Sequence, residues 1–184
     1  MGYDAAINKA WNELLALQPP NNLSVKFLAD EYAIDVEDRK VVSFSCNVPA
    51  KDHAGILILH YLVKKLSGGI PGLSTEWLDF REISGIEGYQ SAFRQRVIEP
   101  IIRKYGKNPE GLLSVLERFP AKKVPQADIG IVIEVLSGVA VLVLFWRGDE
   151  EFGPEANMLF DKSIARVFCT EDVIVLAEII ARQL

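Results

Sequence analysis

Cysteine and histidine are both scarce in this chain, which holds two of each among its 184 residues. Cys46 and Cys169 lie far apart and form no CxxC pair, so they do not supply the all-cysteine ligand set of a zinc site or an iron–sulfur cluster. His53 and His60 lie seven residues apart, which is about 10 Å along a helix and too far for both to bind one metal ion. We therefore expect two free thiols, no iron–sulfur cluster and no metal site.

An excess of basic residues is also missing, since the formal net charge is −5. Phosphate binding requires a concentrated basic surface, so nucleic acid is not an expected partner. The first residues carry neither the basic region nor the apolar core of an export signal, which predicts a cytoplasmic protein. The expected partner is a small molecule or another protein, and the oligomeric state is left open.

Long hydrophobic runs are limited to one stretch, residues 129–146. It contains Glu134 in its first half and Ser137-Gly138 at its middle. A charged residue at the centre of a bilayer costs about 3 kcal/mol, and the run is barely long enough to span. Its many valines and isoleucines around Ser137-Gly138 predict a buried β-hairpin instead of a membrane helix.

Hydrophobic periodicity and turn residues predict helices alternating with groups of strands. The segment 74–83 is expected to be a short strand or an extended loop, and Thr170 is expected to be the N-cap of the last helix. Strands are predicted over 32–36, 41–45, 129–136 and 139–146, and helices over 4–17, 51–66, from about 87 with a kink at Pro100, 108–119 and 171–182. This order predicts one α+β domain over residues 1–184, with an N-terminal helix within 1–20 and helices packed on a mostly antiparallel sheet.

Arginine and histidine supply the first candidates for chemistry. His60 lies among apolar residues, where it is either a hydrogen-bonded core residue or a base or ligand at the edge of a pocket. Arg81-Glu82 stands close to two glycines, where the arginine could clamp an anionic ligand or pair with an acid within the fold. Arg94 is expected on a solvated helix face, whereas Arg96, beside Phe93, is expected to reach inward.

The stretch "VLFWRGDEEFGPEANMLFD", residues 143–161, concentrates acids behind an apolar run. A strand continuing past Trp146 would place Asp149 and Glu151 on one face, where they could bind a divalent cation or act as an acid–base pair. Gly148-Asp149 is also a turn signal, which would make the acids solvated or structural. We favour the turn, and we expect Asp161 to bond to backbone amides of the turn that follows it.

Three motifs give the chain a resemblance. "LHYL" (59–62), "WLDFREISGIEGYQSAFRQRVIEPI" (77–101) and "FWRGDEEFGPEANMLFD" (145–161), followed by "TEDVIVLAEIIARQL", resemble an uncharacterised domain family of anaerobic bacteria and archaea. The resemblance covers the region 52–184. Some relatives carry an additional cysteine-rich iron–sulfur segment, which this chain lacks. The relatives occur in organisms that use corrinoid and one-carbon chemistry, so the resemblance implies a corrinoid as a possible ligand.

We weigh three functions. The first is a non-catalytic protein that binds a small molecule or cofactor, such as a corrinoid, in anaerobic metabolism. The second is a metal-assisted enzyme that uses Asp149 and Glu151, and the third is a module that docks on another protein. The candidate ligand-binding residues are His60, Trp77, Arg81, Glu82, Tyr89, Arg96, Trp146, Asp149, Glu151 and Asp161.

Overall fold

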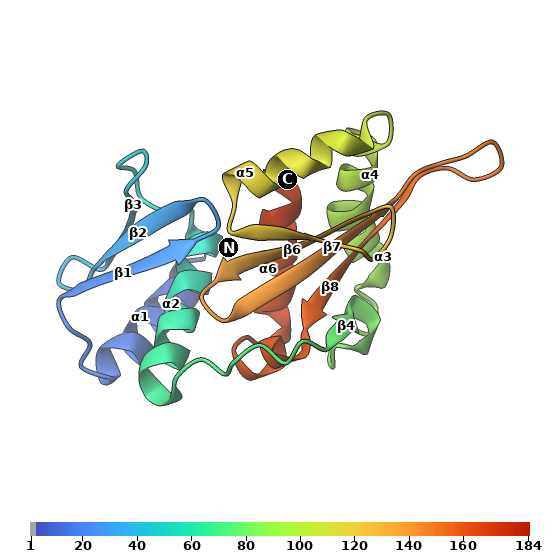
Figure 1. The fold of residues 1–184 in the computed structure, drawn as a ribbon. Helices are drawn as coiled ribbons and strands as arrows, with labels where there is room; N and C mark the ends of the chain where they lie inside the picture. Colours follow the sequence, from blue (N-terminus) through green and yellow to red (C-terminus); the bar gives the residue numbers. More distant parts are fainter. Residues whose placement is uncertain (1–2) are drawn as a thin grey trace. The chain divides into compact units, whose positions relative to one another are not determined.

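The computed structural model describes residues 3–184, and the chain divides into two compact units, with the boundary between Pro71 and Gly72. Each unit combines helices with an antiparallel sheet (Figure 1). The predicted α+β class is therefore confirmed. No helix among the described residues has the length and apolar character needed to cross a membrane. Cys46 and Cys169 are both free, as predicted.

The first unit is a three-stranded sheet with two helices. Its elements are α1 (Asp4–Ala16), β1 (Asn22–Phe27), β2 (Asp30–Asp35), β3 (Lys40–Ser43) and α2 (Asp52–Gly68). The strands follow the order β1-β2-β3, and the strands predicted over 32–36 and 41–45 are present as β2 and β3, which pair antiparallel. The side chains of Trp11, Phe27 and Leu59 are buried in its core. Gly69 ends α2 with a positive φ of 77°, a conformation that glycine adopts without strain.

The second unit contains a five-stranded antiparallel sheet in the order β4-β8-β7-β6-β5. Its strands are β4 (Trp77–Asp79), β5 (Ala121–Val124), β6 (Ile129–Leu136), β7 (Val139–Trp146) and β8 (Glu155–Asp161). The predicted hairpin is present as β6 and β7, which turn at Ser137-Gly138. Every residue of β7 except Trp146 is buried, as expected for a strand covered on both faces.

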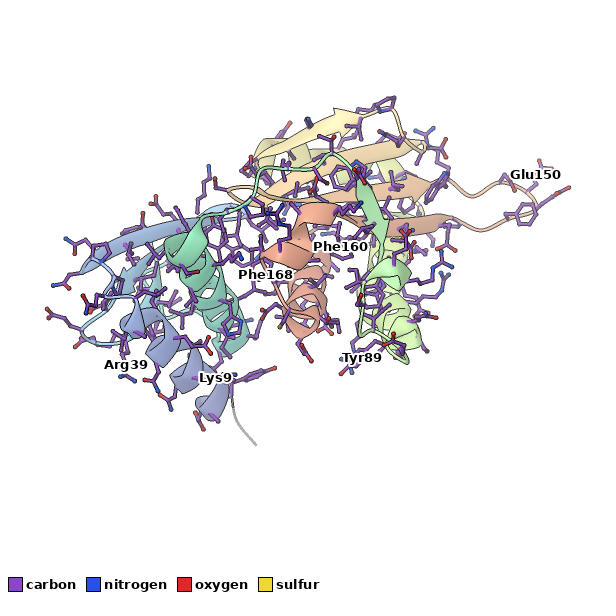
Figure 2. All side chains as sticks on the ribbon, turned by 90° about the horizontal axis from the view of Figure 1, so that it is seen from below. Lys9, Arg39, Tyr89, Glu150, Phe160 and Phe168 are labelled. Carbon is purple, nitrogen blue, oxygen red and sulfur yellow. The ribbon has the colours of Figure 1, made fainter. Side chains whose placement is uncertain are left out.

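The helices α6 (Thr170–Gln183), α3 (Gln90–Phe93) and α4 (Glu99–Tyr105) lie on one face of this sheet (Figures 1 and 2). The π-helical turn η2 (Arg94–Ile98) joins α3 to α4 directly before Pro100, which confirms the predicted interruption. A 3₁₀ segment, η3 (Pro109–Ser114), and the short α5 (Val115–Arg118) replace the single helix expected there.

The predicted N-cap of the last helix is wrong. Cys169 occupies the N-cap position of α6, and Thr170 is already its first helical residue. The Thr170 hydroxyl instead donates a hydrogen bond of 2.8 Å to the carbonyl oxygen of Ser84. The threonine therefore ties the start of α6 to the segment that precedes α3.

Candidate functional site

The candidate site lies in the second unit, where part of β8 has a neighbouring strand on only one side. β4 pairs with only the last three residues of β8, because Asp79 opposite Leu159 is its final residue. There the chain turns into the 3₁₀ segment η1 (Phe80–Glu82), whose capping box joins Asp79 and Glu82. The first part of β8, residues 155–158, is therefore paired with β7 on one side and has no strand on the β4 side.

The backbone amides of this free edge are capped by adjacent side chains. The N–H of Ala156 donates to Glu155 Oε1 at 3.1 Å, and the N–H of Met158 donates to Asn157 Oδ1 at 2.8 Å. Side chains that occupy edge amides reduce the tendency of a sheet to pair with other chains. The edge is thus accessible as a surface without presenting unpaired backbone donors at these two positions.

A pocket of about 340 Å³ opens beside this edge. Its floor is apolar, because the rings of Phe80 and Phe93 stack there with their centroids 3.8 Å apart and their planes 8° from parallel. The volume lies at the lower end of the range for pockets that bind small molecules. The lining residues are Asp79, Phe80, Arg81, Gln90, Phe93, Arg94, Ile98, Trp146, Glu155, Ala156 and Asn157.

One side of the rim is organised by Asp79. Its carboxylate accepts hydrogen bonds from Arg81 Nε at 2.8 Å, from the Arg81 N–H at 3.0 Å and from Asn157 Nδ2 at 2.9 Å. Burial alone would raise the pKa of Asp79, but the bonds from Arg81 and Asn157 hold it below its ordinary value. The Arg81 side chain remains 71% exposed, so its outer face is open to a ligand.

Arg94 and Glu155 form the other side of the rim. The two side chains make parallel hydrogen bonds, from Nη1 to Oε1 at 3.2 Å and from Nη2 to Oε2 at 3.1 Å. Burial alone would raise the pKa of Glu155, but the bonds from Arg94 and from the Ala156 N–H, together with the charge of Arg94, hold it below its ordinary value. Both carboxyl groups of the rim are therefore charged at neutral pH, and the two arginines balance them.

Trp146 supplies an aromatic wall. It is the last residue of β7, stands opposite Glu155 and is 39% exposed. Trp146 and Arg81 are thus the two predicted site residues that the structure brings together in this pocket. A planar apolar group on the Phe80–Phe93 floor would also contact the tryptophan, and an attached anionic group would meet the arginines.

Asp161 has a structural role, because its carboxylate accepts hydrogen bonds from the backbone. Only 2% of this residue is exposed. Its carboxylate accepts the Ser74 N–H at 3.0 Å, the Thr75 N–H at 2.9 Å and the Ser163 N–H at 2.9 Å, together with the Ser74 hydroxyl. The bond to Ser163 confirms the predicted contact with the following turn. Trp77 on β4 is the register partner of Asp161 on the neighbouring strand β8, so both residues lie where β4 pairs with β8. Neither of them lines the pocket.

Asp149 also makes local bonds. Its Oδ1 accepts the N–H groups of Glu151 at 2.8 Å and Phe152 at 2.7 Å, and its own N–H donates to the Phe152 carbonyl. These bonds, with that of Phe152 the larger effect, lower the pKa of Asp149. Because β7 ends at Trp146, the predicted turn is confirmed, and the alternative in which a continuing strand aligns Asp149 with Glu151 is wrong.

The remaining predicted residues lie outside the pocket. Glu82 caps the Asp79 N–H at 2.7 Å, and Tyr89 is an exposed residue directly before α3. The prediction that Arg96 reaches inward is wrong, because its side chain is 59% exposed and pairs with Glu178 on α6. His60 lies on α2 in the first unit, whereas the residues that line this pocket belong to the second.

Asp79, Gln90, Arg94, Glu155 and Asn157 are the lining polar residues that sequence reasoning missed. To predict that Glu155 and Asn157 line the pocket, β8 would have to be recognised as a strand. To predict the role of Asp79, the end of β4 would have to be known. Within residues 3–184, no group of three or more histidine, cysteine, aspartate and glutamate side chains could hold a metal ion.

Comparison with known proteins supports the resemblance to a domain family of unknown function. No curated protein and no solved structure matches the chain. One family model, described as "Domain of unknown function (DUF3786)", matches residues 8–183. The match extends across both units and begins ahead of the region from residue 52 that carries the motifs. The chain therefore belongs to the DUF3786 family of domains of unknown function.

Proposed function

We propose that this protein is cytoplasmic and binds a small planar molecule with an attached anionic group, without catalysing a reaction on it. The observation that supports the proposal is the pairing of a stacked Phe80–Phe93 floor with two exposed arginines in one pocket. Burying apolar area contributes about 25 cal/mol per Å², so a ring laid on the floor gains binding energy without a specific polar contact. The arginines then determine which rings are held.

Arg81 is the primary anion contact in this proposal. Its Nε is engaged by Asp79, which fixes the guanidinium at the rim while most of the side chain faces solvent. An arginine held by a neighbour loses less conformational freedom when it binds a carboxylate. Arg94 is held in the same way by Glu155, and its side chain is 55% exposed, so it is the second arginine that a ligand carboxylate can meet.

A corrinoid is one version of this ligand. The resemblance to domains of strict anaerobes with corrinoid chemistry supports it. A corrin ring with its side chains is larger than a pocket of about 340 Å³, so only an edge or a side arm would enter. The proposal therefore favours a smaller aromatic acid and treats cobalamin as the second probe.

The experiment is calorimetric titration of the whole chain with indole-3-carboxylate, benzoate and cobalamin. We expect one of these probes to bind the wild-type protein, and Arg81→Ala to weaken that binding at least about tenfold, the loss expected for one charge-assisted hydrogen bond. Arg96→Ala is the matched control, because Arg96 is a similarly exposed, ion-paired arginine outside the pocket. Absence of binding for all three probes, or an equal loss in both variants, overturns the proposal.

A further inference from the structure

The connection between β7 and β8, residues 147–154, forms an arm that projects beyond the sheet of the second unit. Figure 2 shows Glu150 at its far end. The arm is ordered by its own bonds, because Asp149 holds the amides of Glu151 and Phe152. The outgoing and returning segments of the arm lie so close together that a Cβ on Gly148 would come within 2.9 Å of Pro154. The tip is therefore a turn whose conformation is fixed by hydrogen bonds within it.

The tip exposes an aromatic side chain among acids. Phe152 is 71% exposed, the highest fraction among the large hydrophobic residues within 3–184. Asp149, Glu150 and Glu151 are exposed beside it. Holding a phenylalanine in water forgoes most of the free energy that its burial would contribute. An ordered turn that presents it in this way indicates a surface that docks elsewhere.

A complementary surface exists at the base of the same arm. Trp146 and Glu155, the residues that bracket the arm, both line the pocket over the Phe80–Phe93 floor. Arg81 and Arg94 stand at its rim with side chains that are 71% and 55% exposed. An apolar floor with exposed arginines complements a phenylalanine flanked by acids.

The tip lies at one end of the arm and the pocket at its base, so two copies can each insert a tip into the pocket of the other. When two copies place their arms side by side in opposite directions, a twofold axis lies midway along them. If the tip of one arm then reaches the base of the other, symmetry brings the second tip to the first base. Because the edge amides of Ala156 and Met158 are already capped and Pro154 has no N–H, the contact would rest on side chains.

From this geometry we infer that two copies of the chain associate by exchanging arms. Phe152 of each copy enters the pocket of the other, beside Trp146 and above the stacked rings, and the acids of the tip face Arg81 and Arg94. The inference rests on the shapes of arm and pocket and not on the identity of any small molecule. A ligand that fills the pocket competes with the tip, so it dissociates the pair.

Sedimentation equilibrium of the whole chain tests this association. We expect a monomer–dimer equilibrium whose Kd rises on the order of a hundredfold in Phe152→Ala, since both arms lose a buried aromatic ring. Phe44→Ala is the control, because Phe44 is an exposed phenylalanine of the first unit. It should leave the Kd unchanged.

Mixing two variants distinguishes exchange from any other contact. Arg81→Glu retains the tip and repels it from the pocket, whereas Phe152→Ala retains the pocket and lacks the tip. Only the heterodimer restores one complete tip–pocket contact, so the mixture should associate more tightly than either variant alone. A monomeric wild-type protein, a Kd that Phe152→Ala does not raise, or a mixture no tighter than its components overturns the inference, and none of these results depends on ligand binding.

Discussion

Replacing Asp161 with asparagine tests how the start of β4 is held in place. The carboxylate accepts three backbone N–H groups and one hydroxyl within a residue that is 2% exposed. In Asp161→Asn, Oδ1 can keep Ser74 and Ser163, but the amide group that replaces Oδ2 points a donor at the Thr75 N–H. Loss of that bond and of the negative charge should lower the free energy of unfolding of the second unit by about 2–4 kcal/mol.

Acid titration gives this prediction a second readout. Burial would raise the pKa of Asp161, but the bonds from Ser163 and Ser74 lower it below its ordinary value. A group with a lowered folded pKa stabilises the fold above its unfolded pKa and loses that contribution as pH falls through the folded value. The stability difference between wild type and Asp161→Asn should therefore be full at neutral pH and shrink below about pH 4.

Urea unfolding monitored by tryptophan fluorescence provides the assay, and Trp77, which lies opposite Asp161, contributes to the signal together with Trp11 and Trp146. Glu150→Gln is the control, since it removes one carboxylate from the exposed tip of the arm. A loss below about 0.5 kcal/mol, the level of an ordinary surface substitution, would refute the anchoring role of Asp161. A difference that stays constant down to pH 3 would show that the charge contributes nothing.

Two further predictions concern Asp149 and Cys169. Asp149→Ala should lower the Tm through loss of its turn bonds, and Mg²⁺ should raise the Tm of neither wild type nor variant. A magnesium-dependent rise that disappears in the variant would revive the metal-assisted enzyme. Burial raises the pKa of the Cys169 thiol to about 11, so its alkylation by iodoacetamide, followed by mass spectrometry, should accelerate about tenfold per pH unit from 8 to 10; a rate that levels off near pH 9 would contradict this.

The elements that sequence reasoning found are those whose local pattern agrees with their packing. The β6–β7 hairpin combines apolar β-branched residues with Ser137-Gly138, and α2 combines a helical stripe with a terminal glycine. Both local preference and burial favour the same structure there, so the pattern alone was sufficient.

The missed strands lack that agreement. β8 contains Ala156, Met158 and no β-branched residue, so its composition does not favour a strand, and pairing with β7 overrides it. β1 alternates correctly, but the turn that follows it contains Leu28 with a φ of 55°, where glycine or asparagine is usual. β5 has only four residues, two of them lysines, as befits an edge strand.

Arg94 and Arg96 lie on either side of the start of an irregular turn. Arg94 still follows the α-helical phase of α3, because its N–H bonds to the Gln90 carbonyl, and the additional residue of the π-helical turn η2 lies beyond it. Both side chains are exposed, as expected for Arg94 and not for Arg96. Arg94 pairs with Glu155 at the pocket, and Arg96 pairs with Glu178 on α6. The sequence contains no signal for either ion pair, because both partners lie more than 60 residues away.

The pocket and the protected sheet edge both depend on Asp79. Its backbone N–H bonds to Glu82 and ends β4, which creates the gap beside β8. Its carboxylate fixes Arg81 at the rim and holds Asn157, whose own oxygen caps the Met158 amide. One residue therefore opens the edge of the sheet, prevents that edge from pairing with other strands and orients the arginine beside it. This coupling explains why a pocket can persist at an open sheet edge, where aggregation would otherwise be the expected hazard.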